Sequence, residues 1–222
     1  MPTFALLAHR QPQLVARLVG RLAPHRVVVH VDKGVPVSPF VEALAEHRHC
    51  ELIPDAERVT VTWAGYSVVS AQLALYRRCL EVTAQDDHIV LLSGQDYPLV
   101  GVENVVDFLA SAPYRQHIRL YSPEGILEKE RQFSRRHYQD SGFFGHPQRG
   151  TVSARVSQRI CNVMRWLSGP WPNRVPDGLV LAYGSQWTAL TADCLDELIR
   201  MATPEIRRFF SHVWAPDERF FH

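Results

Sequence analysis

The chain has 222 residues, of which 46% are hydrophobic and 21% are charged, and its formal net charge at pH 7 is +1. This length and composition are typical of an ordinary globular protein with one sizeable core or two small ones. The near-neutral charge gives no electrostatic reason to expect nucleic acid or an anionic membrane as a partner, although local basic patches are compatible with it.

Short apolar runs alternate with helical patterns along the chain. Strands are predicted at residues 4–8, 26–31, 51–53, 88–92, 117–121, 179–182 and 187–190. Apolar residues at helical spacing predict helices over residues 11–22, from Ser67 to Leu80, over 152–167, after Thr191, and from Thr203-Pro204. This alternation predicts an α/β fold with a mixed, mostly parallel sheet flanked by helices, and no repeat or linker marks a domain boundary.

The beginning of the chain and its cysteines indicate a cytoplasmic location. Met1-Pro2-Thr3 leads directly into a strand-like run, without the basic region, long apolar stretch or cleavage site of a leader, and no transmembrane segment is predicted. The four cysteines form no Cys-x-x-Cys pair, which argues against a zinc site or a disulfide framework. We therefore expect buried thiols in a reducing compartment.

Residues 152–167 combine an apolar stripe with basic side chains. The stripe consists of Val152, Val156, Ile160, Val163 and Leu167. Arg155, Arg159 and Arg165 fall largely elsewhere on the helix cylinder, so we interpret them as a solvated face.

Polar residues follow three of the predicted strands at their carboxyl ends. These segments are His9-Arg10, Asp32-Lys33 and Ser93-Gly94-Gln95-Asp96-Tyr97-Pro98. In open α/β sheets, ligands bind in the crevice outside these ends. Each segment alone is also explained as an ordinary strand exit or turn, but the three together favour a ligand site.

The segment from Trp214 to His222 places two acids at the start of an apparent helix. Pro216 suits a first helical position, and Asp217 and Glu218 suit a helix amino terminus. Phe220 and Phe221 are therefore predicted to form the first buried turn of a helix in which the chain stops. Acids at a helix start are also common without any catalytic role.

Five segments stand in a fixed order along the chain. They are His30-Val31-Asp32-Lys33, Trp63-Ala64-Gly65-Tyr66-Ser67, Leu92-Ser93-Gly94-Gln95-Asp96-Tyr97-Pro98-Leu99, Gly184-Ser185-Gln186-Trp187 and Pro216-Asp217-Glu218-Arg219-Phe220-Phe221. As a set they resemble the core-2/I-branching β-1,6-N-acetylglucosaminyltransferase family and the related peptide O-xylosyltransferases. The resemblance extends from Phe4 to His222.

That resemblance implies a GT-A fold, which is Rossmann-like, as a single domain over residues 1–222 that is truncated at its C-terminus. It implies a UDP-sugar donor, usually UDP-N-acetylglucosamine or UDP-xylose, and transfer with inversion to a hydroxyl of a glycan or another acceptor. It also implies no metal or other cofactor. Most GT-A enzymes hold the diphosphate through a metal at Asp-x-Asp, which this chain lacks, and Asp86-Asp87 precede a strand as a solvated turn would.

The resemblance assigns Glu218 as the general base that takes the proton from the attacking hydroxyl. In the xylosyltransferases, the residue after Gly-Ser in the fourth motif is an Asp proposed as base. Here that residue is Gln186, which cannot accept a proton at neutral pH. This difference favours Glu218 and weakens xylosyl transfer as an interpretation.

The same resemblance implies donor-binding residues. Asp32 and Trp63 are expected near the uridine, and Asp96 near the donor sugar or ribose. A tryptophan in the core is the alternative for Trp63. The other donor-binding candidates are His9, Lys33 and Ser93. Family members carry the basic residues that bind the diphosphate in a segment beyond the position of His222, so the 222-residue chain alone is expected to bind the donor weakly or to be inactive. Arg10 and Lys33 are candidates for partial compensation, which their spacing does not show.

The acceptor-binding candidates are Glu130, Arg131, Gln186 and Trp187. Glu128-Lys129-Glu130-Arg131 and Arg135-Arg136-His137-Tyr138 resemble the acceptor-binding loop of the branching enzymes. Exposed mixed charge is the alternative explanation for both segments.

The sequence therefore predicts a bacterial, cytoplasmic, metal-independent and inverting glycosyltransferase that moves N-acetylglucosamine, or a related sugar, from UDP to a hydroxyl acceptor. A nucleotide-sugar-binding module without catalysis and transfer of xylose from UDP-xylose are the alternatives. A GT-A-like nucleotidyltransferase would need metal-binding carboxylates that the sequence does not offer.

Overall fold

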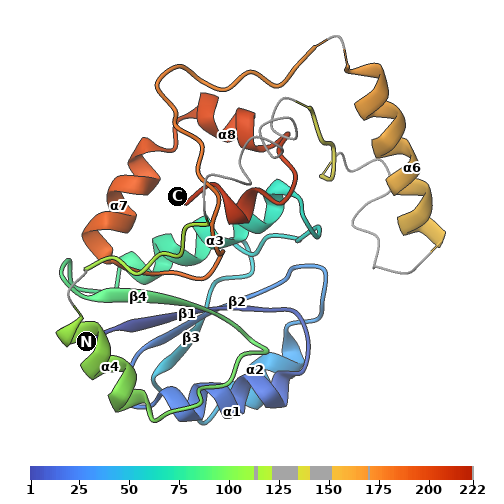
Figure 1. Cartoon of the computed structure of the whole chain (residues 1–222). Coiled ribbons are helices and arrows are strands. Elements are labelled where there is room, and N and C mark those ends of the chain that lie inside the picture. Colours follow the sequence, from blue (N-terminus) through green and yellow to red (C-terminus); the bar gives the residue numbers. More distant parts are fainter. Residues whose placement is uncertain (113–114, 122–134, 141–151, 170, 222) are drawn as a thin grey trace. The chain divides into compact units, whose positions relative to one another are not determined.

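The computed structural model describes residues 1–112, 115–121, 135–140, 152–169 and 171–221 (Figure 1). The chain divides into two compact units, each assembled from several stretches of sequence. The sheet unit contains Met1–Val59, Ala71–Ile118 and Trp187–Ile199, and the second unit contains Thr60–Ser70, Arg119–Gln186 and Arg200–His222. Among the described residues, no helix has both the length and the apolar character needed to cross a bilayer.

The sheet unit is built on five strands in the order β3-β2-β1-β4-β5. The strands are β1 Thr3–Ala8, β2 Val27–Val31, β3 Cys50–Leu52, β4 His88–Ser93 and β5 Ala189–Thr191. β1 pairs in parallel with β2 and β4, and β2 pairs in parallel with β3, whereas β5 is antiparallel to β4. The predicted mixed, mostly parallel sheet of an α/β fold is confirmed.

Helices occupy most of the connections between these strands. They are α1 Pro12–Leu22, α2 Ser38–Leu44, α3 Tyr66–Leu80, α4 Val102–Ser111, α6 Val152–Leu167, α7 Ala192–Met201 and α8 Pro204–Phe210, followed by the 3-10 turn η2 at Pro216–Glu218. α3 and α7 contribute residues to both units. The helix predicted from Thr203-Pro204 is confirmed, because the Thr203 hydroxyl accepts the amide of Ile206 at 3.3 Å as an N-cap.

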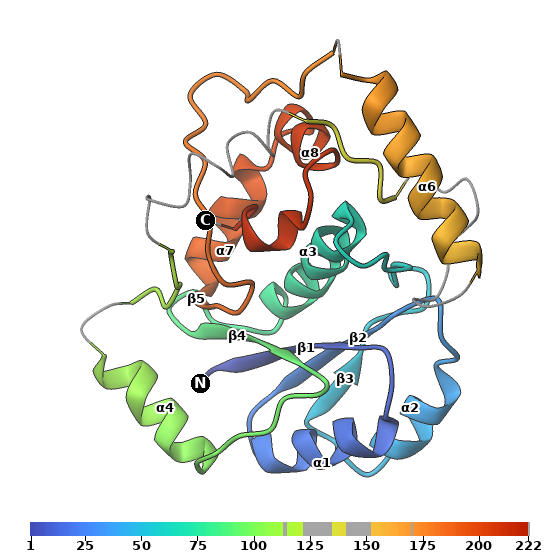
Figure 2. The same ribbon diagram turned by 45° about the vertical axis from the view of Figure 1, so that its right-hand side comes forward.

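The alternation of side chains along the strands explains how the sheet is covered. Phe4, Leu6 and Ala8 of β1 belong to the core that α1 and α2 complete. The intervening Ala5 points to the opposite face and is also fully buried. Figures 1 and 2 show α1 and α2 on one face of the sheet and α3 on the other. Burial on both faces accounts for the continuous apolar runs of β1 and β2.

A close backbone approach fixes the loop that leaves β4. The amide of Gly94 donates to the carbonyl of Leu7 at 2.8 Å. A Cβ at this position would lie 2.9 Å from Val15 Cγ2 and 3.1 Å from Ala8 Cβ. Gly94 therefore lets the Ser93–Asp96 turn stay close to β1 and α1.

The second unit has its own aromatic core. Phe209, Phe210 and Val213 are buried there and pack with Tyr66 and Phe220, among others. The ring of Phe220 lies edge-on to Phe210 and Tyr66, with centroid distances of 5.2 and 5.9 Å. This cluster holds the η2 segment against the start of α3.

Some local predictions are wrong. Residues 117–121 form isolated bridges at His117 and Leu120 instead of a strand, and the predicted strand at 187–190 begins at Ala189. Residues 179–182 form no strand, and Val180 is 86% exposed. Phe220 and Phe221 do not lie in a helix, because η2 ends at Glu218 and Arg219 leaves the helical region at φ −141°.

Candidate functional site

The carboxyl ends of β2, β1 and β4 are neighbours in the sheet unit. The amide of Asp32 donates to the Ala8 carbonyl at 2.8 Å, which continues the pairing of β2 with β1 past the strand ends. The bond from Gly94 to Leu7 does the same for β4. The predicted donor-binding residues of this unit therefore lie along the edge of the sheet that is formed by the carboxyl ends of its strands. They are His9, Asp32, Lys33, Ser93 and Asp96.

A tight turn orients Asp32. Its Oδ1 accepts the amide of Gly34 at 2.8 Å, and its carbonyl accepts the amide of Val35 at 3.1 Å. Near this turn the pKa of His9 is lowered, first by desolvation of its ring and next by the charge of Arg10, while Asp32 acts in the opposite direction. His9 is therefore neutral at pH 7 and can both donate and accept a hydrogen bond.

A buried arginine fixes the loop that carries Asp32. Arg58 donates from Nε to the Val31 carbonyl at 2.9 Å and from Nη2 to the carbonyls of Asp32 and Val35, each at 2.8 Å. Its Nη1 bonds Asp55 Oδ1 at 2.6 Å. Because Arg58 is only 7% exposed, these bonds replace the water that its guanidinium would otherwise bind. The position of Asp32 therefore depends on Arg58.

His30 attaches the same segment to the middle of the sheet. Its Nε2 accepts the amide of Val59 at 3.0 Å. Burial lowers the pKa of His30 to about 4, so the ring is neutral at physiological pH and Nε2 keeps its lone pair for this bond. His30 thus contributes to the site as a structural acceptor beneath the turn.

The Ser93–Asp96 turn is closed by reciprocal hydrogen bonds. Asp96 Oδ2 accepts the amide of Ser93 at 2.7 Å, and the amide of Asp96 donates to the Ser93 carbonyl at 3.0 Å. The hydroxyl of Ser93 accepts the amide of Gln95 at 3.2 Å, and Arg10 Nη2 bonds the Gln95 side chain. One oxygen of the Asp96 carboxylate therefore has a local structural role.

Three of the five sequence motifs meet in the second unit. The amide of Ala215 donates to the Ala64 carbonyl at 3.1 Å, which joins the Pro216 motif to the Trp63 motif. The amide of Gly184 donates to the Glu218 carbonyl at 3.0 Å, which joins it to the Gly184 motif. Arg219 stabilises the Pro216 motif, because its Nη1 donates to the carbonyls of Trp214 and Ala215, each at 2.7 Å.

An unpredicted carboxylate shapes the Trp63 motif. Asp140 accepts the amide and the hydroxyl of Ser67, each at 2.8 Å, and the Ser67 hydroxyl accepts the amide of Thr62 at 2.8 Å. A Cβ on Gly65 would lie 2.2 Å from Asp140 Oδ1, so only glycine allows the carboxylate to come this close. The contact with Asp140 explains why glycine and serine suit positions 65 and 67 of the motif.

Trp63 is an exposed tryptophan. Its side chain is 63% exposed, and its ring lies edge-on to Trp214 with a centroid distance of 5.3 Å. The core alternative for Trp63 is therefore wrong. Because Trp63 is largely exposed, its ring surface is available to a planar ring or to the apolar face of a sugar.

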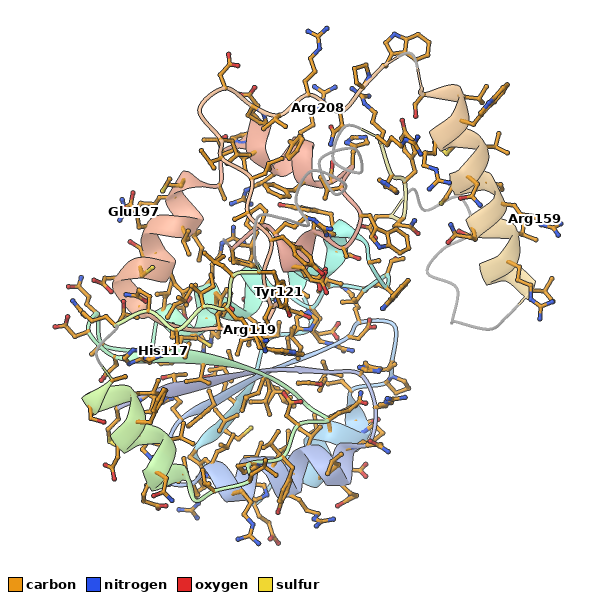
Figure 3. All side chains as sticks on the ribbon, viewed as in Figure 1. His117, Arg119, Tyr121, Arg159, Glu197 and Arg208 are labelled. Atoms are coloured by element: carbon orange, nitrogen blue, oxygen red, sulfur yellow. The ribbon has the colours of Figure 1, made fainter. Side chains whose placement is uncertain are left out.

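Aromatic and cationic side chains surround Glu218. The pKa of Tyr183 is raised, first by desolvation and next by its hydrogen bond to the Glu218 carboxylate. The Tyr183 ring carries the Arg219 guanidinium at 4.9 Å on its face and lies 5.0 Å from the Tyr121 ring. Arg119 lies over Tyr121 at 5.5 Å (Figure 3). Glu218 is thus held by a tyrosine that is itself packed on both sides.

The neighbouring acid has a different environment. The pKa of Asp217 is raised to about 6, chiefly by burial and also by the charge of Glu218, while hydrogen bonding with its own backbone and the charge of Arg219 act in the opposite direction. Its Oδ1 is buried without a hydrogen-bond partner among the described residues. The charged form of Asp217 is therefore costly.

A pocket of about 390 Å³ lies elsewhere in the second unit. Its walls include Arg136, Arg174 and Arg208, together with Trp171 and His212. Arg136 belongs to the segment that resembles the acceptor-binding loop, whereas the predicted acceptor residues Glu130 and Arg131 lie outside the described residues. The other two candidates, Gln186 and Trp187, fall in the second unit and the sheet unit respectively.

The family model of the Core-2/I-Branching enzyme matches residues 3–222, which is nearly the whole chain. The chain belongs to the Core-2/I-Branching enzyme family. The match covers both units and all five motifs, so the predicted family relationship is confirmed.

Curated relatives of this Core-2/I-Branching chain include xylosyltransferases. Xylosyltransferase 2 of Mus musculus is 25% identical over 206 residues, which cover 89% of this chain and 21% of that protein. Xylosyltransferase 1 of Homo sapiens is 25% identical over 231 residues, which cover 99% of this chain and 21% of that protein. The chain therefore spans about a fifth of the length of these relatives.

A solved structure with a distant likeness is 4-diphosphocytidyl-2C-methyl-D-erythritol synthase. It aligns with 94% of this chain and 83% of its own at a TM-score of 0.43 and 11% identity. The fold of this Core-2/I-Branching chain is therefore assigned from its own strand order and register and not from this likeness.

Three residues of the Core-2/I-Branching chain were missed by sequence reasoning. Arg58, Asp140 and Tyr183 act through contacts with residues that lie far away in the sequence. The only local signal was Asp55 three residues before Arg58, a spacing that is common to surface ion pairs. Each of the three supports a residue that the sequence had selected.

Proposed function

We propose that this chain is the donor-binding and catalytic part of an inverting glycosyltransferase that moves a sugar from a UDP-sugar to a hydroxyl of a glycan or another acceptor. The observation that carries the proposal is the meeting of three family motifs at Glu218 through the backbone bonds from Ala215 to Ala64 and from Gly184 to Glu218. Membership of the Core-2/I-Branching family supports the same reaction class.

Glu218 is proposed as the general base. Its carboxylate takes the proton of the acceptor hydroxyl while the acceptor oxygen forms a bond to the anomeric carbon of the donor. The bond from that carbon to the diphosphate breaks in the same displacement, and UDP leaves with the electron pair. Attack opposite the leaving group inverts the anomeric configuration. The bond with Tyr183 supports this role, since it limits the rotation of the carboxylate.

Donor binding is proposed at the edge of the sheet unit. Asp32 and Asp96 would accept hydrogen bonds from the ribose or the sugar. Trp63, a residue of the second unit, is proposed as a further donor-binding residue on the family resemblance alone. Lys33 and Arg10 are the cationic candidates for the diphosphate. We propose transfer without a metal because the sequence has no Asp-x-Asp. A cytoplasmic location also remains a proposal.

The transferred sugar is proposed to be N-acetylglucosamine, with xylose as the second candidate. Gln186 supports N-acetylglucosamine, because it replaces the Asp that xylosyltransferases carry after Gly-Ser. The names of the relatives, xylosyltransferases 1 and 2, favour xylose. Turnover of UDP-N-acetylglucosamine compared with UDP-xylose by the full-length protein distinguishes the two, and we expect the former to be consumed faster.

The test of the reaction is donor turnover by the full-length protein in excess chelator, compared with Glu218→Gln. We expect the wild type to remain active and Glu218→Gln to lose roughly a thousandfold in kcat. Glu197→Gln, which changes an exposed carboxylate on α7, is the matched control and should keep full activity (Figure 3).

Each alternative outcome has a distinct meaning. Equal rates for the wild type and Glu218→Gln would remove Glu218 from the mechanism, and complete loss with chelator would remove the metal-free claim. Calorimetry that detects UDP binding in a protein without turnover would favour a nucleotide-sugar-binding module.

A further inference from the structure

Helix α6 presents its apolar stripe to solvent. Val152, Val163, Trp166 and Leu167 are 72%, 54%, 79% and 56% exposed. On a helix of 3.6 residues per turn, these positions fall within one arc together with Val156. A helix of a globular protein normally turns such an arc towards the core, so this exposed face needs an explanation.

The opposite side of α6 makes its contact with the second unit. Cys161 is buried, and its thiol donates to the Tyr138 carbonyl at 3.0 Å. Cys161 and Val163 are two residues apart and therefore point to opposite sides of the helix. Cys161, Ile160 and Met164 are at least partly buried, whereas the other large apolar side chains of α6 face outward.

The charge of α6 has a single sign. Val152–Leu167 contains Arg155, Arg159 and Arg165 and no Asp or Glu. No carboxylate of the described residues forms an ion pair with these three arginines. Arg155 lies at the edge of the stripe next to Trp166, and Arg159, one turn further along, lies within the arc between Trp166 and Val152. Figure 3 shows Arg159 projecting outward from α6.

These features together fit one kind of partner. An exposed apolar arc that contains a tryptophan and carries two arginines on one side is the pattern of a helix that lies in the interface of an anionic bilayer. At 16 residues with three arginines, α6 is too short and too charged to span the membrane. A second copy of the same face would bring two rows of arginines together, which repel each other.

We propose that α6 is a membrane-surface helix that binds anionic phospholipid with its apolar stripe in the interface. The stripe enters the boundary between headgroups and acyl chains, and Arg155 and Arg159 meet the lipid phosphates. This inference rests on α6 alone and does not depend on the proposed reaction. It would place the protein next to membrane-bound molecules.

The experiment is sedimentation of the full-length protein with vesicles of phosphatidylglycerol and phosphatidylcholine, compared with phosphatidylcholine alone. We expect binding to the anionic vesicles that weakens with salt. Val163→Asp should reduce the partition coefficient at least roughly tenfold. The matched control is Val180→Asp, which places the same charge at a position that is 86% exposed and lies outside α6, and it should bind as the wild type does.

A second variant tests the charge separately from the apolar stripe. Arg155→Gln with Arg159→Gln should weaken binding to anionic vesicles by about 25-fold, or about fivefold per charge. Circular dichroism is expected to be unchanged, because both side chains are exposed.

Three results would overturn the proposal. One is the absence of binding to anionic vesicles, and another is equal binding by Val163→Asp and Val180→Asp. The third is a wild-type dimer in light scattering that Val163→Asp dissociates, which would assign the stripe to a second copy of the chain.

Discussion

The carboxylates of the two units are held in different ways. In the sheet unit, Asp32 and Asp96 accept backbone amides in tight turns at the strand ends. In the second unit, Glu218 accepts a hydrogen bond from Tyr183, and the Oδ1 atom of Asp217 is buried without a partner among the described residues. The first arrangement fixes position at little energetic cost, whereas the second raises the pKa of Asp217.

The largest effect on stability is expected in the sheet unit. Arg58→Met removes a buried guanidinium that donates to the carbonyls of Val31, Asp32 and Val35, so each of these carbonyls loses a hydrogen bond. We expect a loss of about 3 kcal/mol in the free energy of unfolding and weaker UDP binding, measured by urea denaturation and calorimetry. Arg26→Met changes an exposed arginine and serves as the control. Unchanged stability of Arg58→Met would contradict the structural role.

A smaller effect on stability, and one of opposite sign, is expected when Asp217 of the second unit is changed. The pKa of Asp217 is about 6 in the folded protein, against about 3.9 when unfolded, so the native state binds the proton more tightly. The stabilising contribution of this carboxyl to the free energy of unfolding is therefore present below about pH 4 and is lost as pH rises to about 6. Asp217→Asn removes the charge and should raise stability at pH 7.5 by about 2–3 kcal/mol.

The measurement is urea denaturation of the wild type and Asp217→Asn at pH 4 and pH 7.5. The gain in the free energy of unfolding that Asp217→Asn gives at pH 7.5 should be absent at pH 4. Asp177→Asn, an exposed acid of the same unit, should show no gain at either pH. Equal gains by Asp217→Asn at the two pH values would indicate that the carboxyl is not protonated in the native state.

The smallest effect is expected at Tyr183. Tyr183→Phe removes the hydroxyl that bonds Glu218 but keeps the ring that packs on Arg219 and Tyr121. We expect kcat to fall about fivefold with little change in donor KM. Tyr76→Phe, in the core of the sheet unit, should leave kcat unchanged. An unchanged kcat of Tyr183→Phe would leave Tyr183 with a packing role only.

The three central strands β2, β1 and β4 were predictable because they are mainly apolar runs, and β1 and β2 are buried on both faces. The predicted bounds of these strands differ from the observed ones by a single residue at one end. Residues 179–182 have the same apolar character but no strand beside them, and local sequence cannot show that difference. The same limit applies to 117–121, which forms bridges only.

The site was predictable only in part. Strand ends and family motifs selected Asp32, Asp96 and Glu218, because these positions follow from local pattern. Arg58 and Tyr183 depend on contacts across the fold, and no periodicity or spacing reports such contacts. The helix expected at Phe220 does not form. The Arg219 side chain donates to the carbonyls of Trp214 and Ala215 and so competes with helical backbone hydrogen bonds. Helix propensity does not include such side-chain contacts.

The most direct test is a crystal structure of the full-length protein with UDP and an acceptor. We predict that the uridine and ribose lie at the sheet edge with Asp32 and Asp96, and that the Glu218 carboxylate is about 3 Å from the acceptor hydroxyl. UDP bound away from Asp32 and Asp96, or an acceptor hydroxyl out of reach of Glu218, would contradict the account.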